Sequence, residues 1–200
     1  MVDRRVLQVG TVTHFEGDQT MRKLKWLSDA EIQTNADALA AVLPDCVAGG
    51  ASVSFMGDLQ VDQAQQFFAR VPADVRSGRR ALLAVFNDQR LDGTAQLLLG
   101  VPPNQPHRVE LAKMLVHRRA RRSGLGRALF DEVEREAIAR GKTLLTFDTV
   151  TGGPAERMYV RCGCVKVGEI PGYALFPDGV PVATSVFYKE LRIGLTNRHR

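Results

Sequence analysis

A basic segment of the chain, residues 118–127, has the composition of a site for an anionic ligand. Two glycines, Gly124 and Gly126, lie within it. Glycine lets a backbone curl and lets a phosphate come close to the N–H groups. The segment also holds five arginines: Arg118, Arg119, Arg121, Arg122 and Arg127. Full positive charges around such a turn favour a phosphate or a diphosphate.

Two carboxylates stand inside sequences that otherwise favour strands. Glu110 lies within the stretch 109–112, and Asp148 lies within 144–149. Aspartate is a poor strand former, and an unpaired charge in a covered sheet is costly. Burial would raise the pKa of such a carboxyl group toward neutrality and make it a better base. We therefore expect Glu110 and Asp148 to take a proton from a substrate, directly or through water.

Other roles remain open for this pair. Both carboxylates could hold a substrate ammonium without moving a proton. Asp148 could instead accept a hydrogen bond from a loop N–H, and Glu110 could pair with an arginine. Lys113 follows Glu110 by three residues, and regular strand alternation would turn it to the opposite face of the sheet. We interpret Lys113 as a structural partner or as a side chain that keeps its ammonium in solvent, not as a nucleophile.

The basic segment connects an expected strand to an expected amphipathic helix. The strand covers 108–116, and the helix covers about 126–140 and ends at Gly141. The first N–H groups of a helix have no partner within it, and the helix dipole places partial positive charge there. This arrangement favours phosphate binding. The segment contains neither Gly-x-x-x-x-Gly-Lys-Ser/Thr nor Gly-x-Gly-x-x-Gly, which excludes a P-loop and disfavours a Rossmann site.

Helices and then strands are expected before the basic segment. Ser28 and Glu31 have the spacing of a capping box, and apolar residues then recur at helical spacing until Pro44. A second helix follows at 61–76, which Pro72 could break. Residues 81–86 form a nearly continuous apolar run, which suits a strand covered on both faces. A second strand is expected at 93–100.

The second half alternates strands and helices. The expected elements are a strand at 143–150, a helix from 154 to 161, and strands at 165–170 and 182–191. This order predicts one α/β or α+β domain with a mixed sheet. We assign the domain to residues 21–191. Residues 1–20, in which part of 6–14 could be a strand, are assigned to an N-terminal extension, and residues 192–200 to a C-terminal tail.

Charge and composition exclude several classes of protein. The net charge is +5, and without the five arginines of the basic segment the 22 other basic residues would equal the 22 acidic ones. A nucleic-acid-binding protein would need a broader basic stripe or stacking aromatic residues. The basic segment has no aromatic residue, and the chain is only 6% aromatic. We therefore expect no nucleic-acid partner.

The chain of 200 residues is 44% hydrophobic and 24% charged, a composition typical of a globular protein. Its apolar runs are too short to cross a bilayer, and its first residues lack the apolar segment of a signal peptide. We expect a cytoplasmic protein with no membrane partner. Cys46, Cys162 and Cys164 have neither disulfide-framework nor zinc-site spacing, so we expect them to be buried and no metal to be bound.

Two motifs resemble those of the GNAT superfamily of acetyltransferases. The pattern Arg-x-x-Gly-x-Gly at 121–126, after a strand and before a helix, resembles the pyrophosphate loop of that family. The later helix of the family has an alanine, a tyrosine four residues on, and a glycine four beyond that. Ala155, Tyr159 and Gly163 fit this pattern. The resemblance implies the GNAT fold.

The resemblance runs from about Met21 to Leu191 and has two departures. Gly152 stands where many members have asparagine, so it is not expected to bind the cofactor. Cys164 stands where many members have phenylalanine. The chain looks closer to the tabtoxin-resistance acetyltransferases, which implies a role in resistance to a toxin or antibiotic. This likeness is carried by residues 49–56, 109–116, 167–173 and 177–179.

The resemblance implies that acetyl-CoA is the cofactor. Backbone groups of Met114 and Val116 would bind the pantetheine, and an N–H near Leu115 or Val116 would face the thioester oxygen. Tyr159 would give a proton to the departing thiolate, although it could instead be a core aromatic residue. The pyrophosphate would be bound by Arg121, Arg122, Ser123, Gly124, Leu125, Gly126 and Arg127.

The predicted activity is direct transfer of the acetyl group to a primary amine of a small molecule in a ternary complex. No cysteine or serine lies in a nucleophile elbow, which disfavours an acyl-enzyme. The expected acceptor-binding residues are Ser54, Phe55 and Tyr173, in a cleft with Glu110, Asp148 and Glu169 that suits a cationic amine or an amino acid. The alternatives are transfer to a protein or peptide, and a non-catalytic acyl-CoA-binding module. The protein is expected to be a monomer or a homodimer.

Overall fold

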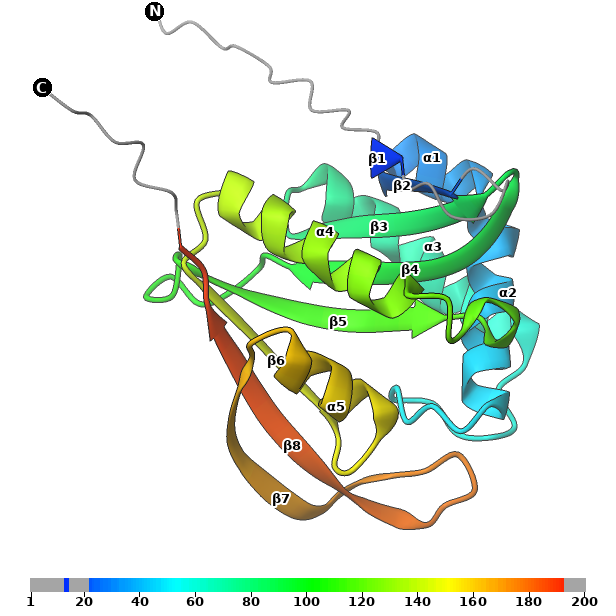
Figure 1. The fold of residues 1–200 in the computed structure, drawn as a ribbon. Helices are drawn as coiled ribbons and strands as arrows, with labels where there is room; N and C mark the ends of the chain where they lie inside the picture. The colour runs from blue at the N-terminus through cyan, green and yellow to red at the C-terminus, as the bar shows by residue number, and fades with distance from the viewer. Residues whose placement is uncertain (1–12, 15–21, 193–200) are drawn as a thin grey trace, which may run out of the picture.

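The computed structural model describes residues 13–14 and 22–192. Eight strands of this part form one mixed sheet, in the order β1-β2-β3-β4-β5-β6-β8-β7 (Figure 1). Neighbouring strands are antiparallel except β5 and β6, which are parallel. The strands are β1 (Thr13–His14), β2 (Arg22–Leu27), β3 (Arg80–Asn87), β4 (Arg90–Leu98), β5 (Arg108–Val116), β6 (Leu144–Val150), β7 (Val165–Leu175) and β8 (Pro181–Glu190).

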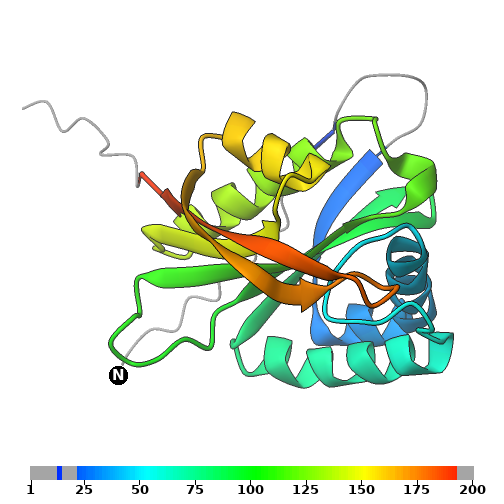
Figure 2. The ribbon, with the colours of Figure 1, turned by 90° about the horizontal axis from the view of Figure 1, so that it is seen from below.

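Helices cover both faces of the sheet (Figures 1 and 2). The first face carries α4 (Leu125–Ala139) and α5 (Pro154–Arg161), and the second carries α1 (Asp29–Thr34), α2 (Ala36–Ala48) and α3 (Val61–Arg76). Each face has its own buried cluster of apolar side chains. Leu83 of β3 packs on the α4 side, whereas its neighbour Leu82 packs on the α3 side. Burial on both faces explains the continuous apolar run of β3.

The capping box at the first helix is confirmed, but the helix boundaries differ from the prediction. Ser28 caps α1, and its side chain and that of Glu31 make the reciprocal bonds of the box. The single helix expected up to Leu43 is instead α1 and α2, and α2 passes through Pro44. The break near Pro72 does not occur. Proline removes one hydrogen bond, but buried side chains after Pro44 and around Pro72 hold both helices together.

Strand positions agree with the sequence except at the ends of the chain. β2 is a strand that the sequence analysis missed, because its basic residues conceal a short apolar pattern. β7 continues past the expected residue 170 to Leu175. The proposed strand within 6–14 and the extension 1–20 lie largely outside the described residues, and the tail does so from residue 193. The three cysteines are buried and free, as predicted.

The parallel pair β5–β6 separates soon after it forms. Pairing is limited to 108–110 with 144–146, although β5 runs on to Val116 and β6 to Val150. Among the described residues, the backbone of β5 beyond Glu110 therefore has no strand partner on its β6 side. Such an edge is free to bind an extended ligand.

A bulge interrupts β5 within this separated stretch. Ala95 of β4 lies opposite two residues of β5, Lys113 and Met114, where a regular ladder would place one. Lys113 has a left-handed backbone, with φ of +48°. The extra residue changes the alternation, so that Met114 packs on the α4 side and Leu115 on the α2 side. A bulge of this kind re-aims the side chains that follow it.

Candidate active site

The basic segment forms the connection between β5 and α4. Residues 118–120 make one 3-10 turn, and two residues with positive φ, Arg122 (+61°) and Gly124 (+79°), then lead into Leu125. A side chain on Gly124 would meet no protein atom within 4 Å, although its positive φ would be strained for any other residue. The open space beside Gly124 and the first-turn N–H groups of α4 fit a diphosphate.

Three of the five arginines of this segment are already paired. Arg118 binds Asp45 at 2.8 Å, Arg119 binds Asp92 at 2.7 Å, and Arg127 binds Asp131 at 2.7 Å. Arg121 and Arg122 are exposed and have no ion pair among the described residues. The sequence analysis treated all five as charge around one diphosphate. The structure instead uses Arg118 and Arg119 to fasten the loop to α2 and β4.

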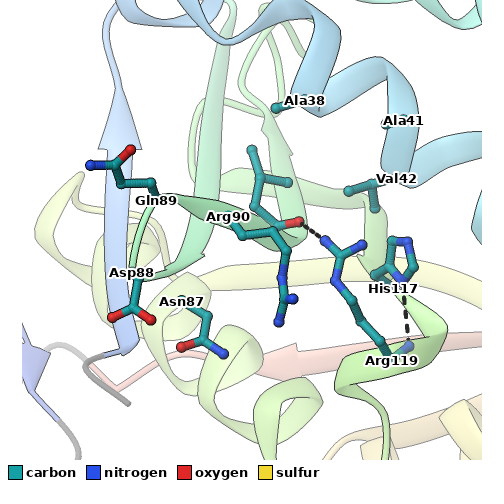
Figure 3. Close-up of a pocket in the computed structure, with 10 residues that line it drawn as sticks. Ala38, Ala41, Val42, Asn87, Asp88, Gln89, Arg90, His117 and Arg119 are labelled. Atoms are coloured by element: carbon teal, nitrogen blue, oxygen red, sulfur yellow. Dashed lines mark hydrogen bonds between the residues drawn. The ribbon is translucent and has the colours of Figure 1, made fainter.

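The pocket in Figure 3 lies behind this loop and shows how it is fastened. Its volume is about 740 Å³, and its walls come from α2, the β3–β4 turn and the residues that follow β5. The guanidinium of Arg119 donates to the carbonyl oxygen of Leu91 at 2.6 Å, and the N–H of Arg119 donates to Nδ1 of His117 at 3.3 Å. Asp92, which is 2% exposed, anchors the same guanidinium. These bonds preset the loop before any ligand arrives.

Asp92 was not among the predicted site residues. The strand was expected to begin one residue after it, at 93, whereas β4 begins at Arg90, so the signal of a carboxylate inside a strand marks Asp92 only once the strand boundary is known. No comparable signal marks Asp45, which reaches the loop from α2 through two bonds to Arg118. Its role depends on tertiary packing alone.

Tyr159 of α5 lies on the first face of the sheet, next to β5. It is 5% exposed and packs against the ring of Phe147, with 4.4 Å between the centroids. Its hydroxyl lies 3.9 Å from the sulfur of Met114. Burial raises the pKa of Tyr159 above its ordinary value, so the hydroxyl keeps its proton. Tyr159 is thus a core aromatic residue whose protonated hydroxyl is directed toward the Met114 side chain on β5.

A groove lies between α4 and α5, next to the loop. It has a volume of about 440 Å³ and is lined by Arg127, Met158, Arg161 and Cys162. A side chain at Gly126 would come within 3.1 Å of the sulfur of Met158. Glycine at this position therefore lets α4 and α5 approach each other beside the loop.

Glu110 and Asp148 lie together on the second face, where β5 and β6 separate. Desolvation, the larger cause, and the negative charge of Glu110 raise the pKa of Asp148, and Lys113 opposes them. Protein atoms surround much of the carboxyl group, but Asp148 keeps solvent-exposed surface at this opening. Glu110 pairs with Arg108 at 3.4 Å, and Arg108 also donates to Thr146 of β6 at 2.9 Å. The pairing of Glu110 with an arginine, which the sequence left open, therefore occurs.

Lys113 does not point away from Glu110, as strand alternation had suggested. The bulge turns its side chain to the second face, where Nζ lies 3.1 Å from Oγ of Ser54. Nζ also lies 5.8 Å from the ring centroid of Phe55. Ser54 and Phe55, two of the expected acceptor-binding residues, thus meet Lys113 at the opening that contains Asp148. The periodicity of a regular strand gives no sign of this arrangement.

The other expected acceptor residues lie elsewhere. Tyr173 is on the outer strand β7 and is 60% exposed. Glu169 of β7 lies opposite Ser185 of β8, which in turn lies opposite Thr149 of β6. The side chains of Thr149 and its neighbour Asp148 point to opposite faces of the sheet, so Glu169 faces away from Asp148. The carboxylate of Glu169 binds Lys166 at 3.1 Å, and Lys166 also binds Glu156 of α5. The expectation that Glu169 shares a cleft with Glu110 and Asp148 is therefore wrong, because the strand register puts it on the first face.

The loop after α2 is tied to the β7–β8 hairpin across the second face (Figure 2). The hydroxyl of Ser52 donates to the carbonyl oxygen of Leu175 at 2.8 Å. The N–H of Gly57 donates to the carbonyl oxygen of Pro177, also at 2.8 Å. A side chain at Gly57 would come within 2.8 Å of the Pro177 oxygen. The loop that carries Ser54 and Phe55 is therefore held in place by the β7–β8 hairpin.

The described residues contain neither a membrane-spanning helix nor a candidate metal site. Within residues 22–192, each helix is too short or too polar to cross a bilayer. The same residues hold no group of three or more histidine, cysteine, aspartate or glutamate side chains that could bind a metal ion.

A model of the acetyltransferase (GNAT) family matches residues 53–164, which is more than half of the chain. This match contains the loop after β5, the bulge, and Tyr159. It begins at the residues that meet Lys113 and ends at Cys164.

Solved structures with low sequence identity have the same fold. An N-acetyltransferase from Staphylococcus aureus Mu50 is 14% identical, with a TM-score of 0.71 over 86% of this chain and 99% of that chain. A Salmonella typhimurium protein solved with acetyl-CoA as its cofactor is 16% identical, with a TM-score of 0.69 over 86% and 94%. A ribosomal-protein-alanine N-acetyltransferase from Brucella melitensis is 20% identical, with a TM-score of 0.69 over 84% and 99%.

Proposed function

The chain belongs to the acetyltransferase (GNAT) family, and on that basis we propose that it acetylates the primary amine of a small molecule by direct transfer. It is an acetyl-CoA-dependent acyltransferase with a mixed sheet of the GNAT type. One observation supports direct transfer above all. Tyr159 and Asp148 lie on opposite faces of the sheet at the same opening, between β5 and β6, where the Tyr159 hydroxyl keeps its proton and the pKa of Asp148 is raised.

The residues present fit the cofactor. Bound acetyl-CoA supplies the thioester whose acetyl group is transferred. We propose that the N–H groups of residues 122–127 hold the diphosphate, with Arg121 and Arg122 as the free charges beside it. Backbone groups of Met114 and Val116, on the unpaired edge of β5, would hold the pantetheine. The groove between α4 and α5 would accommodate the part of the cofactor next to the loop.

Each proton has a residue to receive or supply it. An acceptor amine arrives as an ammonium and must lose a proton before it can attack, and Asp148 takes that proton. Its raised pKa brings it closer to the pH at which a carboxylate base works well. Tyr159 gives its hydroxyl proton to the departing sulfur, and the second proton that the nitrogen loses as the amide forms restores the tyrosine hydroxyl. A backbone N–H at Leu115 or Val116 would stabilise the charge that develops on the thioester oxygen, an interaction of about 3 kcal/mol in enzymes where one such donor was removed.

Glu110 has a different part from Asp148 in this proposal. Its carboxylate is bound to Arg108, so it is less available as a base. Its negative charge helps raise the pKa of Asp148. We therefore assign the base role to Asp148 and treat Glu110 as a residue that tunes it.

The acceptor remains the open part of the proposal. A toxin or antibiotic acceptor would agree with the resemblance to the tabtoxin-resistance branch. Transfer to a protein terminus is the second candidate, since the fold is shared with a ribosomal-protein-alanine N-acetyltransferase. A non-catalytic acyl-CoA-binding module would have no use for a proton acceptor at Asp148.

Thiol release from acetyl-CoA tests this proposal. The full chain is incubated with acetyl-CoA and a panel of small amines, amino acids and peptides, and free thiol is followed with time. We expect saturable release that depends on a small amine. Release only with peptides would favour the second candidate. No release from any amine, with acetyl-CoA still raising the melting temperature, would favour the non-catalytic module.

A further inference from the structure

Lys113 reaches the second face of the sheet only because β5 bulges at that residue. Its backbone is left-handed, with φ of +48°, a conformation that is costly for a residue with a side chain. Ser54, whose hydroxyl contacts the Lys113 ammonium, is left-handed too, with φ of +71°. Two strained residues from segments far apart in the sequence therefore meet through one hydrogen bond. Strain of this kind is concentrated at functional sites.

The surroundings of the ammonium are mostly aromatic. Nζ lies 5.8 Å from the ring centroid of Phe55 and 5.9 Å from that of Phe67 on α3. The two rings meet edge to face, with 5.6 Å between their centroids. Rings of this kind orient a cation and remove water around it. They leave the hydrogen-bonding capacity of the ammonium largely unused, because an ammonium has three donors and Ser54 takes one.

The nearby carboxylates do not neutralise this cation. Glu110, three residues earlier on β5, is bound by Arg108. Among the described residues, no carboxylate lies within 4.0 Å of Nζ. Asp148 acts on Lys113 only from a longer distance. Desolvation lowers the pKa of Lys113, and an anion bound beside it would raise that pKa.

We propose that Lys113 determines the acceptor class by binding a carboxylate of the acceptor, so that the substrate is a zwitterion such as an amino acid. This inference rests on the proposed function, because it places the amine of the acceptor at Asp148. Asp148 and Lys113 act on each other's charge across the opening, and neither has an ion-pair partner among the described residues. This pair of opposite charges suits a zwitterion, with its ammonium toward Asp148 and its carboxylate toward Lys113. A simple cationic amine would leave Lys113 without an anion.

Matched acceptors test this inference. Initial rates of thiol release are measured with the common amino acids and with their carboxamides, which keep the amine and lose the negative charge. We expect wild-type kcat/KM to be roughly 10- to 100-fold higher for the best acid than for its amide, the range for one charge-assisted hydrogen bond. The difference should lie mainly in KM, because Lys113 holds the acceptor and does not move protons.

Substitutions of Lys113 by side chains of similar length test whether its charge causes the preference for the acid. Lys113→Met should remove the preference for the acid, and Lys113→Arg should keep most of it. Lys23→Met is the matched control, since Lys23 is an exposed lysine on β2, away from the opening. It should leave the preference unchanged. Melting temperatures of the variants show whether each one is folded.

Equal kcat/KM for acids and amides in the wild type would overturn the inference, and so would a preference that survives in folded Lys113→Met. Calorimetric titration of the same amino acids into the protein with coenzyme A separates this outcome from failure of the proposed function. Binding that requires both the acid and Lys113, without thiol release, would support the inference and refute the activity. The absence of binding and of release would refute both.

Discussion

The two faces of the sheet carry proposed sites that are built in different ways. On the first face, the proposed donor site is one continuous segment, 114–127, in which backbone groups and glycines would do most of the binding. On the second face, the proposed acceptor site consists of the separate side chains of Ser54, Phe55, Lys113 and Asp148. A backbone site suits a ligand that a whole family shares. A site made of side chains can change its ligand without a change of fold.

The supports of the two sites differ in the same way. The donor loop is fastened from behind by two aspartates, Asp45 and Asp92, that bind its arginines. The acceptor site is supported by the bulge at Lys113 and by the bonds from the loop after α2 to the β7–β8 hairpin. Changes on the first face should therefore alter cofactor affinity, and changes on the second should alter turnover or acceptor preference.

The largest effect is expected for a substitution of Asp148, which should lower the rate without changing cofactor affinity. We expect Asp148→Asn to lower kcat/KM for the amine by about 10³-fold, within the range for loss of general-base catalysis, because asparagine cannot take the proton. The affinity for acetyl-CoA should not change, because Asp148 lies on the other face. Steady-state rates and calorimetric titration measure the two quantities. Full rates in both Asp148→Asn and Glu110→Gln at neutral pH would remove carboxylate catalysis from the mechanism.

The pH dependence sharpens the same assignment. The pKa of Asp148 is raised, so this carboxyl group is protonated at a higher pH than an ordinary aspartate and cannot then act as a base. The value of kcat/KM should therefore fall as the pH falls through that raised pKa. Glu110→Gln should move this acidic limb to lower pH, because it removes a negative charge that raises the pKa. If the acidic limb of the pH profile does not move in Glu110→Gln, a group other than Asp148 causes that limb.

Tyr159 should give the next largest effect. Tyr159→Phe keeps the packing against Phe147 and removes only the hydroxyl, so turnover should fall by about 10²-fold. The affinity of the Tyr159→Phe variant for acetyl-CoA, measured by calorimetric titration, should stay close to that of the wild type. Unchanged turnover would leave Tyr159 as a core residue alone. A fall in melting temperature large enough to unfold the variant is not expected, since the ring remains.

A pair of glycines at the two ends of α4 tests the donor face. Gly124 and Gly141 have similar positive φ values, +79° and +73°, and a Cβ at either would meet no atom within 4 Å. Alanine at each should cost a similar 1–2 kcal/mol of strain, by the general cost of a left-handed residue. Only Gly124→Ala should also weaken acetyl-CoA binding, by about tenfold. Equal affinities in the two variants would show that the loop does not hold the diphosphate.

The smallest expected effect lies outside both sites. Ser28→Ala removes the capping box of α1 and should lower the free energy of unfolding by about 1 kcal/mol. Chemical denaturation would measure this change. Cofactor affinity and acceptor preference should both stay unchanged, because α1 contributes no residue to either site. A change in either would mean that the two faces are not independent of the first helix.

The sequence predicted the elements of the first face much better than the side-chain arrangement of the second. The strand at 108–116, the loop and the helix after it form one local pattern, so these elements could be predicted before the fold was seen. Glu110 and Asp148 were selected as candidates because carboxylates are unusual in strands. Lys113 was misplaced because a bulge of one residue changes the face, and no local signal announces it. Glu169 was misplaced for a related reason, the register of β7.

The central claim is that a donor on one face and an acceptor on the other meet at the opening between β5 and β6. Two-substrate initial rates test it most directly, with acetyl-CoA varied at several fixed concentrations of the best amine. Double-reciprocal lines that intersect are predicted, because both substrates must be bound before the acetyl group moves. Parallel lines, together with an acetylated protein after incubation without amine, would contradict the account, because the acetyl group would then pass through the enzyme itself.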